Sequence, residues 1–247
     1  MKEKKIEKTD IMYSIILALS VIIIVVNRII VGFPSVLWLC DFASLFSILY
    51  TINMAKHNVW GFIFNIIATL LTAITCFYQQ IYLNATMCIF INIPSMVIGL
   101  VSWIKNEKSG KEEQNLKGLS KKKLIMFGVF AIMAGGIFTY ILYLLDGNLF
   151  YLDGIFSALC MTGVVLASKM YIEQYYFFIP ANFLGIVFYT ILCFQNMSNL
   201  PFVLTNVIFT IVSIMGYVNW KKLQREQNEN LLKEKSSTCE IENKVEE

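Results

Sequence analysis

The run VWGFIFNIIATLLTAITCFYQ, residues 59–79, is apolar along almost its whole length and contains no charged side chain. A transmembrane helix needs about 20 such residues to cross the hydrocarbon core of a bilayer. In lipid, the backbone polar groups must be bonded within the segment, so a continuous apolar run spans as a helix. The run also lacks the apolar-polar alternation of a barrel strand. It therefore predicts a transmembrane helix.

Runs of the same kind recur on both sides of this one, separated by short polar connectors. We expect transmembrane helices at 11–31, 36–54, 59–79, 84–104, 124–144, 149–168, 175–194 and 200–220. The chain is 57% hydrophobic and 15% charged, whereas soluble domains have about 45–50% and about 25%. The first run is too long for the apolar core of a signal peptide and no A-x-A site follows it, so we expect it to be retained. The sequence predicts an all-α polytopic membrane protein with eight transmembrane helices.

The basic residues give these helices an orientation. If the N-terminus lies inside, every lysine and arginine except Arg28 falls in an inner segment. Cytoplasmic segments of membrane proteins carry such an excess of positive charge. We therefore expect both termini in the cytoplasm, with Arg28 snorkelling at the outer end of the first helix. The net charge of +3 comes from loops and tails, and it does not indicate nucleic-acid binding.

An internal repeat relates two parts of the chain at a shift of 117 residues. The shift pairs Asn65 with Asn182, Cys76 with Cys193, Phe77 with Phe194, Leu83 with Leu200, Gly99 with Gly216, Val101 with Val218 and Trp103 with Trp220. Asp41 matches Asp153 after a difference in loop length. Three crossings in each unit and one connecting helix give both units the same orientation, as in parallel-repeat transporters. We expect the domains to be 1–35 (N-terminus and extra helix), 36–104 (first three-helix repeat), 105–148 (cytoplasmic linker and connecting helix), 149–220 (second three-helix repeat) and 221–247 (flexible cytoplasmic tail).

Polar side chains at membrane depth are candidates for a substrate path, because lipid rejects them and they should face the bundle interior. They are Asn65, Thr69, Thr72, Asn92, Asn182, Tyr189 and Asn206. The alternative is that they join helices by hydrogen bonds, which suffices for any single threonine. Asn65 and Asn182 share one repeat position. We expect these two amides, with Asn92, Tyr189 and Asn206, to contact a substrate.

Aromatic residues gather at the start of the seventh expected helix. Tyr175 and Phe178 are spaced to share one helix face, and Asn182 lies one turn deeper on nearly the same side. Stacked aromatic rings and an amide suit a flat heteroaromatic ligand. The sequence therefore predicts that Tyr175 and Phe178 stack on the substrate.

Several other residues have two readings. Asp41 and Asp153 either cap their helices or attract a cation at the entrance, and the structural role is favoured. Trp103 and Trp220 stand beside lysines, which favours an aromatic belt at the inner interface. The lone histidine, His57, follows a lysine in a short loop and is expected to be solvated.

Motifs for chemistry are missing from the sequence. The chain has no G-x-x-x-x-G-K-[ST], no H-E-x-x-H and no carboxylate pair at helical spacing inside the spans. We therefore expect no enzyme activity, no catalytic residue, no metal and no cofactor. A small-molecule carrier without its own energy source remains, with a non-transporting scaffold or accessory subunit as the rival class.

Residues 36–222 resemble the bacterial PnuC-type nicotinamide riboside or nicotinamide mononucleotide transporters. The resemblance rests on Asp153…Lys169, Glu173-Gln174-Tyr175, Asn182 and Gly216…Asn219-Trp220-Lys221-Lys222, with Asn58-Val59-Trp60-Gly61, Asn65 and Gly99…Trp103 in the first half. One difference concerns a W-x-x-W pair that the riboside carriers share after the glutamate. Here Tyr175 and Phe178 take those places, so both indole N–H donors are missing.

The resemblance implies two three-helix units joined by a central helix, in a bacterial plasma membrane. It implies facilitated diffusion of a vitamin or nucleoside, which a cytoplasmic kinase then phosphorylates and traps. Family members carry nicotinamide riboside, thiamine, riboflavin or deoxynucleosides, so the changed aromatic pair leaves the cargo open within this class. The family also suggests a homotrimer.

Overall fold

Helices account for almost all of the described chain. The computed structural model describes residues 8–31, 35–78, 82–108, 118–146, 149–195 and 200–245. The elements are α1 (Lys8–Val31), α2 (Ser35–Ala55), α3 (Trp60–Tyr78), α4 (Tyr82–Met87), the π-helix η1 (Cys88–Asn92), α5 (Ile93–Lys108), α6 (Lys121–Leu144), α7 (Phe150–Ser168), the 3₁₀-helix η2 (Ile172–Gln174), α8 (Tyr175–Gln195) and α9 (Leu200–Val245).

Seven helical stretches of the described chain are long and apolar enough to cross a membrane. They are Trp38–Ala55, Trp60–Tyr78, Ala85–Lys105, Lys121–Leu144, Phe150–Ser168, Ile172–Phe194 and Phe202–Glu229. In α1, the apolar stretch is the shorter Ile11–Val26. The expectation of an all-helical membrane protein is confirmed, and seven of the eight expected spans meet the length and hydropathy of a crossing.

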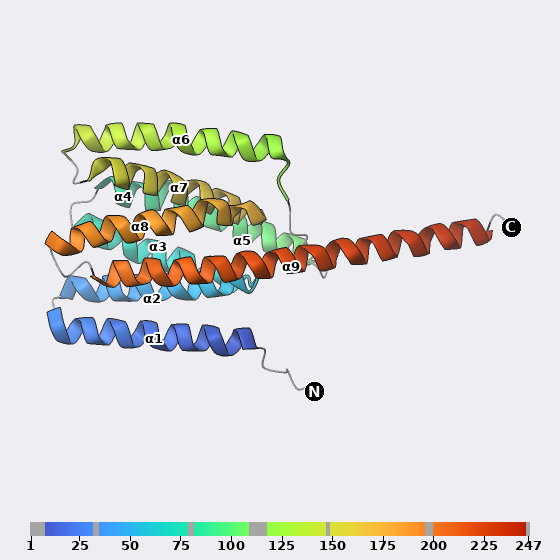
Figure 1. Cartoon of the computed structure of the whole chain (residues 1–247), viewed down its shortest axis with the longest axis horizontal. Coiled ribbons are helices and arrows are strands. Elements are labelled where there is room, and N and C mark those ends of the chain that lie inside the picture. The colour runs from blue at the N-terminus through green and yellow to red at the C-terminus, as the bar shows by residue number, and fades with distance from the viewer. Residues whose placement is uncertain are drawn as a thin grey trace.

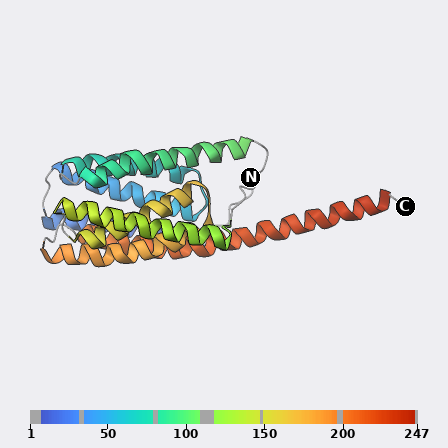
Figure 2. The ribbon, with the colours of Figure 1, turned by 90° about the horizontal axis from the view of Figure 1, so that it is seen from above.

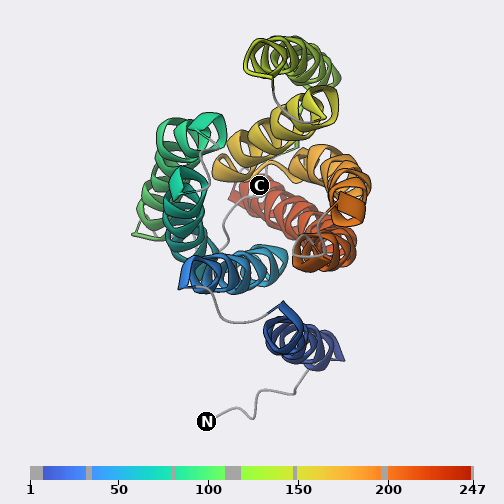
Figure 3. The same ribbon diagram turned by 90° about the vertical axis from the view of Figure 1, so that its left-hand side faces the viewer.

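Six of the helices pack into a closed ring. In order around the ring, α2 contacts α3, α3 contacts α5, α5 contacts α7, α7 contacts α8, α8 contacts α9, and α9 contacts α2. Figure 3 looks along this ring, with α6 outside it against α7 and α1 outside it near α2 and α9. The ring therefore joins the first and second expected repeats along two seams, α9 with α2 and α5 with α7.

The two ends of the ring differ in charge. The start of α1 and the extension of α9 lie at the same end (Figure 1). Lysines are found at this end, at the end of α2 and α7, at the start of α6 and in α9: Lys56, Lys121, Lys122, Lys123, Lys169, Lys221 and Lys222. We call it the basic end. Among the described residues, the opposite end carries one arginine, Arg28, in the last turn of α1.

The last helix continues far beyond the ring. Figure 2 shows α9 leaving the bundle at the basic end as a single helix, and it ends at Val245. The expected flexibility of 221–247 stays a prediction, but the segment is helical up to Val245 in the structure.

A proline explains the widened turn before α5. Pro94 has no N–H, and its ring clashes with the carbonyl four residues earlier, in a regular α-helix. The backbone avoids this by forming η1 directly before it, where the N–H of Ile93 bonds the carbonyl oxygen of Cys88. A π turn is rare, and where it occurs inside an α-helix it often lies at a functional position.

The sequence predicts that Arg28 snorkels to the interface, and this prediction is wrong. Its guanidinium forms an ion pair with Asp41 of α2, and it lies 5.8 Å from the centroid of the Trp38 ring. Arg28 and Asp41 are only 3% and 8% exposed. The Asp41 carboxylate gives the arginine a buried partner, so α1 is fastened to α2 by charge as well as by apolar contact.

Candidate functional site in the interior of the helix ring

An apolar cluster fills the ring at its basic end. It contains Met54, Phe62, Met96, Trp103, Val164, Ala167, Met170, Ile172, Tyr175 and Trp220. These residues come from all six helices of the ring and from the turn before α8. We call this set the basic-end cluster. Because every ring helix contributes to it, the ring is closed at this end in the structure.

Two tryptophans hold the loop between α2 and α3 inside the basic-end cluster. The His57 ring lies 4.7 Å from that of Trp103 and 5.0 Å from that of Trp220, centroid to centroid. The two tryptophans are 3% and 0% exposed, so the expected aromatic belt at the interface is wrong. His57 is largely covered rather than solvated, and its backbone has a positive φ of 56°. Burial lowers the pKa of His57 from 6.5 to about 4.

Hydrogen bonds join α9 to the end of α2 at the same place. The indole N–H of Trp220 donates to the carbonyl oxygen of Met54 at 2.7 Å. The Asn219 side-chain amide donates to the carbonyl oxygen of Ala55, also at 2.7 Å. The last carbonyls of a helix lack partners within that helix. Here α9 donates to two of them, one of which also accepts from the His57 N–H, and this ties the two halves of the ring together at the basic end.

The expected stacking pair belongs to this closed end. Tyr175 is 4% exposed, and its ring lies edge-on to Trp220 with centroids 5.7 Å apart. A Cβ on Gly216 would lie 2.6 Å from the Tyr175 hydroxyl oxygen, so only glycine leaves room for this ring. Phe178 packs on Gly163 in the same way, with a Cβ there 2.7 Å from its ring. The structure brings Tyr175 and Phe178 to one cluster, in which Tyr175 is buried and Phe178 is partly buried.

The four expected amides lie in different places. Asn182 donates from α8 to the hydroxyl of Ser213 on α9 at 3.2 Å. Asn206 donates to the carbonyl of Phe202 in its own helix, and its side chain fills the space beside Gly185. Both amides therefore belong to the seam between α8 and α9.

The first half of the ring holds the other two amides. Asn65 accepts a hydrogen bond from Thr69 at 3.3 Å on α3, and Asn92 bonds Cys88 within η1. Asn65 and Asn182 are 8% and 6% exposed. Both are therefore buried, but among the described residues no hydrogen bond joins one to the other. Thr72 instead bonds a carbonyl of its own helix.

Polar side chains from four helices gather inside the ring, between the basic-end cluster and the opposite end. Asp153 lies close enough to interact electrostatically with Cys160, Tyr189 and Cys76. Tyr50 lies close to Cys160 and also packs against the basic-end cluster. We call these five residues the interior polar cluster. Tyr50, Cys160 and Tyr189 are surrounded by protein and still keep part of their surface accessible. The interior polar cluster therefore lies within the ring, with part of its surface accessible.

Aromatic rings flank the interior polar cluster. Tyr189 stacks on Phe202 of α9, with centroids 5.0 Å apart, and meets Phe188 edge-on at 4.9 Å. Phe156 of α7 meets Tyr189 edge-on at 6.3 Å. Of these aromatic residues, the sequence predicts only Tyr189 as a site residue.

The polar residues of α7 have a spacing that the sequence does reveal. Asp153, Ser157 and Cys160 follow one another at i, i+4 and i+7, which indicates one helix face.

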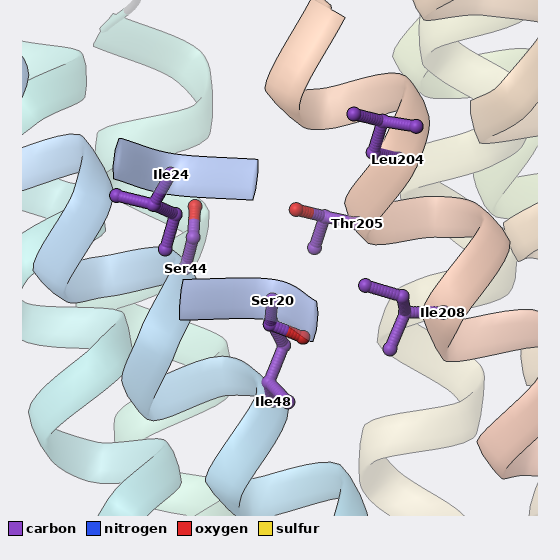
Figure 4. Close-up of a pocket in the computed structure, with 7 residues that line it drawn as sticks. All are labelled: Ser20, Ile24, Ser44, Ile48, Leu204, Thr205 and Ile208. Atoms are coloured by element: carbon purple, nitrogen blue, oxygen red, sulfur yellow. The ribbon is translucent and has the colours of Figure 1, made fainter. Parts of the chain in front are cut away.

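The described residues offer no metal site, and the pocket drawn in Figure 4 is too small for a ligand. Nowhere among them do three His, Cys, Asp or Glu side chains come close enough to share a metal ion. The pocket in Figure 4 lies outside the ring, between α1, α2 and α9, and is lined by Ser20, Ile24, Ser44, Ile48, Leu204, Thr205 and Ile208. Its enclosed space suits about one water molecule. None of the expected site residues lines it.

Comparisons with known proteins point to one family. Residues 37–222 match the family described as nicotinamide mononucleotide transporter. The nicotinamide riboside transporter PnuC of Neisseria mucosa is 25% identical over 191 residues, which cover 75% of this chain and 73% of that protein. The protein of the same name from Haemophilus influenzae is 24% identical over 198 residues, covering 77% and 82%.

A solved structure has the same fold. The crystal structure of the vitamin B3 transporter PnuC matches with a TM-score of 0.71 at 23% sequence identity, over 88% of this chain and 92% of that chain. The family match begins in α2 and ends in α9. It therefore includes every helix of the ring and leaves out α1 and the extension of α9.

Proposed function

Because this chain belongs to the nicotinamide mononucleotide transporter family, we propose that it carries nicotinamide riboside, or a related aromatic vitamin or nucleoside, by facilitated diffusion. The family makes the chain a membrane transporter and not an enzyme. One observation supports the path most directly: apolar side chains fill the six-helix ring at its basic end, and partly accessible polar side chains follow them toward the opposite end. The substrate path in this proposal is the interior of the ring.

The proposed membrane arrangement has eight spans, with α1 as the extra first helix. The first unit is α2, α3 and the continuous stretch from α4 to α5, and the second unit is α7, α8 and α9, with α6 connecting them. Two features support this parallel 3+1+3 repeat. Trp103 and Trp220 pack on the same histidine, and Gly99 and Gly216 each leave room for an aromatic ring, of Phe62 and Tyr175 respectively.

The proposed orientation places the basic end, and with it both termini, in the cytoplasm of a bacterial cell. The lysines at that end support this orientation, because positive charge is retained on the cytoplasmic side. The structure is then closed toward the cytoplasm. Release of substrate inside requires the basic-end cluster to separate, together with the two hydrogen bonds from α9 to the end of α2.

The proposed contacts follow from this movement. Tyr175 and Phe178 stack on the substrate ring once the basic-end cluster opens, because Trp220 and Gly163 cover them in the closed form. Asn182, Asn206 and Tyr189 bond the substrate from the seam of α8 and α9, and Asn65 and Asn92 bond it from the first unit. The π turn before Pro94 and the proline inside α8, Pro180, supply the bending points.

Two parts of the proposal concern partners. A cytoplasmic kinase traps the cargo by phosphorylation, since a facilitator alone only equalises concentrations. The functional unit is a homotrimer in the bilayer. The broad apolar faces support packing between copies or against lipid: on α6, Ile132, Met133 and Tyr140 are exposed.

The changed aromatic pair favours a related cargo as the second candidate. Tyr175 and Phe178 provide aromatic faces but no indole N–H, so a substrate that needs those two donors binds less well here. Thiamine, riboflavin and deoxynucleosides are the alternatives within the family. A non-transporting scaffold or accessory subunit is the alternative outside it.

Uptake into proteoliposomes tests the proposal. The purified chain is reconstituted, and uptake of nicotinamide riboside, thiamine and riboflavin is compared with that of protein-free vesicles. We expect saturable uptake of at least one of them. Asn182→Leu should weaken its binding about tenfold, because a buried polar group that loses its partner costs about 1–3 kcal/mol. Phe183→Leu, a change at an exposed neighbour on α8, is the matched control.

Each outcome has a consequence. No uptake of any compound and no ligand-dependent thermal shift would leave the scaffold class in place of the carrier. Uptake with unchanged affinity in Asn182→Leu would keep the carrier and remove the assignment of the α8–α9 seam as its site.

A further inference from the structure

Two aspartates lie near the end of the ring that faces away from the basic end, and their surroundings differ. Asp41 on α2 is paired with Arg28. Asp153 on α7 accepts a hydrogen bond from Ser157, 3.2 Å from the serine oxygen to the Asp153 Oδ1 atom. Among the residues that the structure describes, no lysine or arginine forms an ion pair with Asp153. One carboxylate is therefore neutralised by the protein, and the other is not.

Asp153 is a member of the interior polar cluster. With Ser157 and Cys160 it forms one face of α7, and Tyr189 and Cys76 approach this face from α8 and α3. The next residue along α7, Gly154, packs on Thr139 of α6. The two neighbours therefore point to different sides of α7, Gly154 out of the ring and Asp153 toward its interior.

The start of α7 explains part of this position. Asp153 lies in the first turn of the helix, where a negative charge is favoured by the helix dipole. An acidic residue on any face of that turn would serve this purpose. The dipole does not account for a partly covered carboxylate among polar side chains in the interior of the ring. In a membrane such a carboxylate is costly without a countercharge, and it commonly marks the path of an ion or substrate.

We propose that Asp153 binds the positive charge of the transported molecule, and that the cargo is an organic cation with a quaternised nitrogen in an aromatic ring. This inference rests on the proposed function and narrows it. Nicotinamide riboside and thiamine both carry such a nitrogen, and riboflavin and deoxynucleosides do not. The proposal thus divides the family's possible cargoes by charge.

The aromatic rings beside Asp153 fit the same chemistry. Tyr189, stacked on Phe202 and edge-on to Phe156, places an aromatic ring near the carboxylate. The face of an aromatic ring attracts a cation, and the attraction grows where water is excluded. A carboxylate and a ring together stabilise a flat, delocalised cation better than a small hydrated ion, because the flat cation loses less hydration on entering.

Two probes that differ in the charge of the ring and share the rest of their structure test whether Asp153 binds a cation. Nicotinamide riboside carries a pyridinium charge, whereas its dihydropyridine form carries none. Binding and proteoliposome uptake are measured for both, with thiamine and riboflavin as a second charged and neutral pair. We expect the wild-type chain to prefer the charged form by about tenfold or more, a difference of about 1.4 kcal/mol.

Three variants locate the effect. Asp153→Asn should weaken binding of the charged form by about tenfold and leave the neutral form within about twofold. Asp153→Glu keeps the charge and should retain most of the preference. Asp146→Asn removes an exposed carboxylate just before α7 and should change neither probe. The neutral probe also verifies that Asp153→Asn is folded.

The outcomes separate the inference from the function. Equal uptake of charged and neutral probes, uptake of riboflavin alone, or a preference that survives in Asp153→Asn would overturn the role of Asp153 and leave a carrier. Uptake of thiamine alone, reduced in Asp153→Asn, would support it. Uptake of none of the four compounds would reject the proposed function, and the inference with it.

Discussion

Asp41 and Asp153 occupy related places in α2 and α7, but only Asp41 has a countercharge among the described residues. Asp41 is neutralised within the protein by Arg28, and Asp153 faces polar and aromatic side chains with one hydrogen bond from Ser157. The first arrangement stabilises the fold, because each charge balances the other where water is scarce. The second leaves a negative charge available to a ligand. The comparison teaches that position along the sequence does not separate a structural carboxylate from a binding one; its countercharge does.

The largest effect should come from breaking the Arg28–Asp41 pair. Arg28→Ala leaves the Asp41 carboxylate buried without a countercharge, which costs about 3–5 kcal/mol. Thermal unfolding in detergent should show a large fall in Tm. Removing both charges, as Arg28→Leu with Asp41→Leu, should restore much of it. Lys222→Ala removes a pair that is 74% and 53% exposed and should shift the stability by less than about 1 kcal/mol. An equal fall in Tm in Arg28→Ala and Lys222→Ala would show that the buried ion pair stabilises the fold no more than the exposed one.

His57 extends the comparison to a group that the ring keeps neutral. Its pKa is lowered from 6.5 to about 4 by burial between two tryptophans. The unfolded chain therefore takes up a proton at a higher pH than the folded chain. The contribution of the neutral His57 to stability is therefore complete above pH 6.5, and the free energy of unfolding falls by up to about 3 kcal/mol as the pH drops toward 4. Tm measured from pH 7.5 to 4.5 checks this. His57→Gln should flatten the slope in that range, and an unchanged slope would contradict the burial of the imidazole.

Asp153→Asn should have the smallest effect on stability. The substitution removes a charge that the described residues do not balance, and such a change is commonly neutral or mildly stabilising. We expect a change within about 1 kcal/mol, in contrast to the loss in Arg28→Ala. The same Tm assay serves for both. A loss as large as that of Arg28→Ala would place Asp153 among the structural residues.

The spans could be predicted from the sequence because lipid imposes a length and a composition on each of them. The run 59–79 becomes α3 from Trp60 to Tyr78, and the neighbouring runs also match their helices. What composition does not fix is the direction in which a side chain points. Trp103 and Trp220 stand beside lysines, as belt residues do, but they turn inward onto His57. Their direction depends on how six helices meet, and that is a property of the packed ring.

The candidate site shows the same division. The sequence correctly placed Asn65 and Asn182 away from lipid, since both are buried. It did not reveal that Tyr175 is covered by Trp220, because this contact joins α8 to α9 across the closed end. The countercharge of Asp41 lies on a different helix, and no local pattern names it. For Asp153, the spacing to Ser157 and Cys160 was a usable signal of one shared face.

The central claim is that substrate passes through the ring and meets the interior polar cluster from the side away from the basic end. Cys160, a free cysteine of that cluster, provides a direct test once the other cysteines are replaced by serine or alanine. A small, membrane-impermeant thiol reagent is added to proteoliposomes from one side or the other, with and without nicotinamide riboside. The account predicts labelling from the side opposite the basic end, slowed by substrate. Labelling only from the basic-end side, or at a rate that transported substrate does not change, would contradict it.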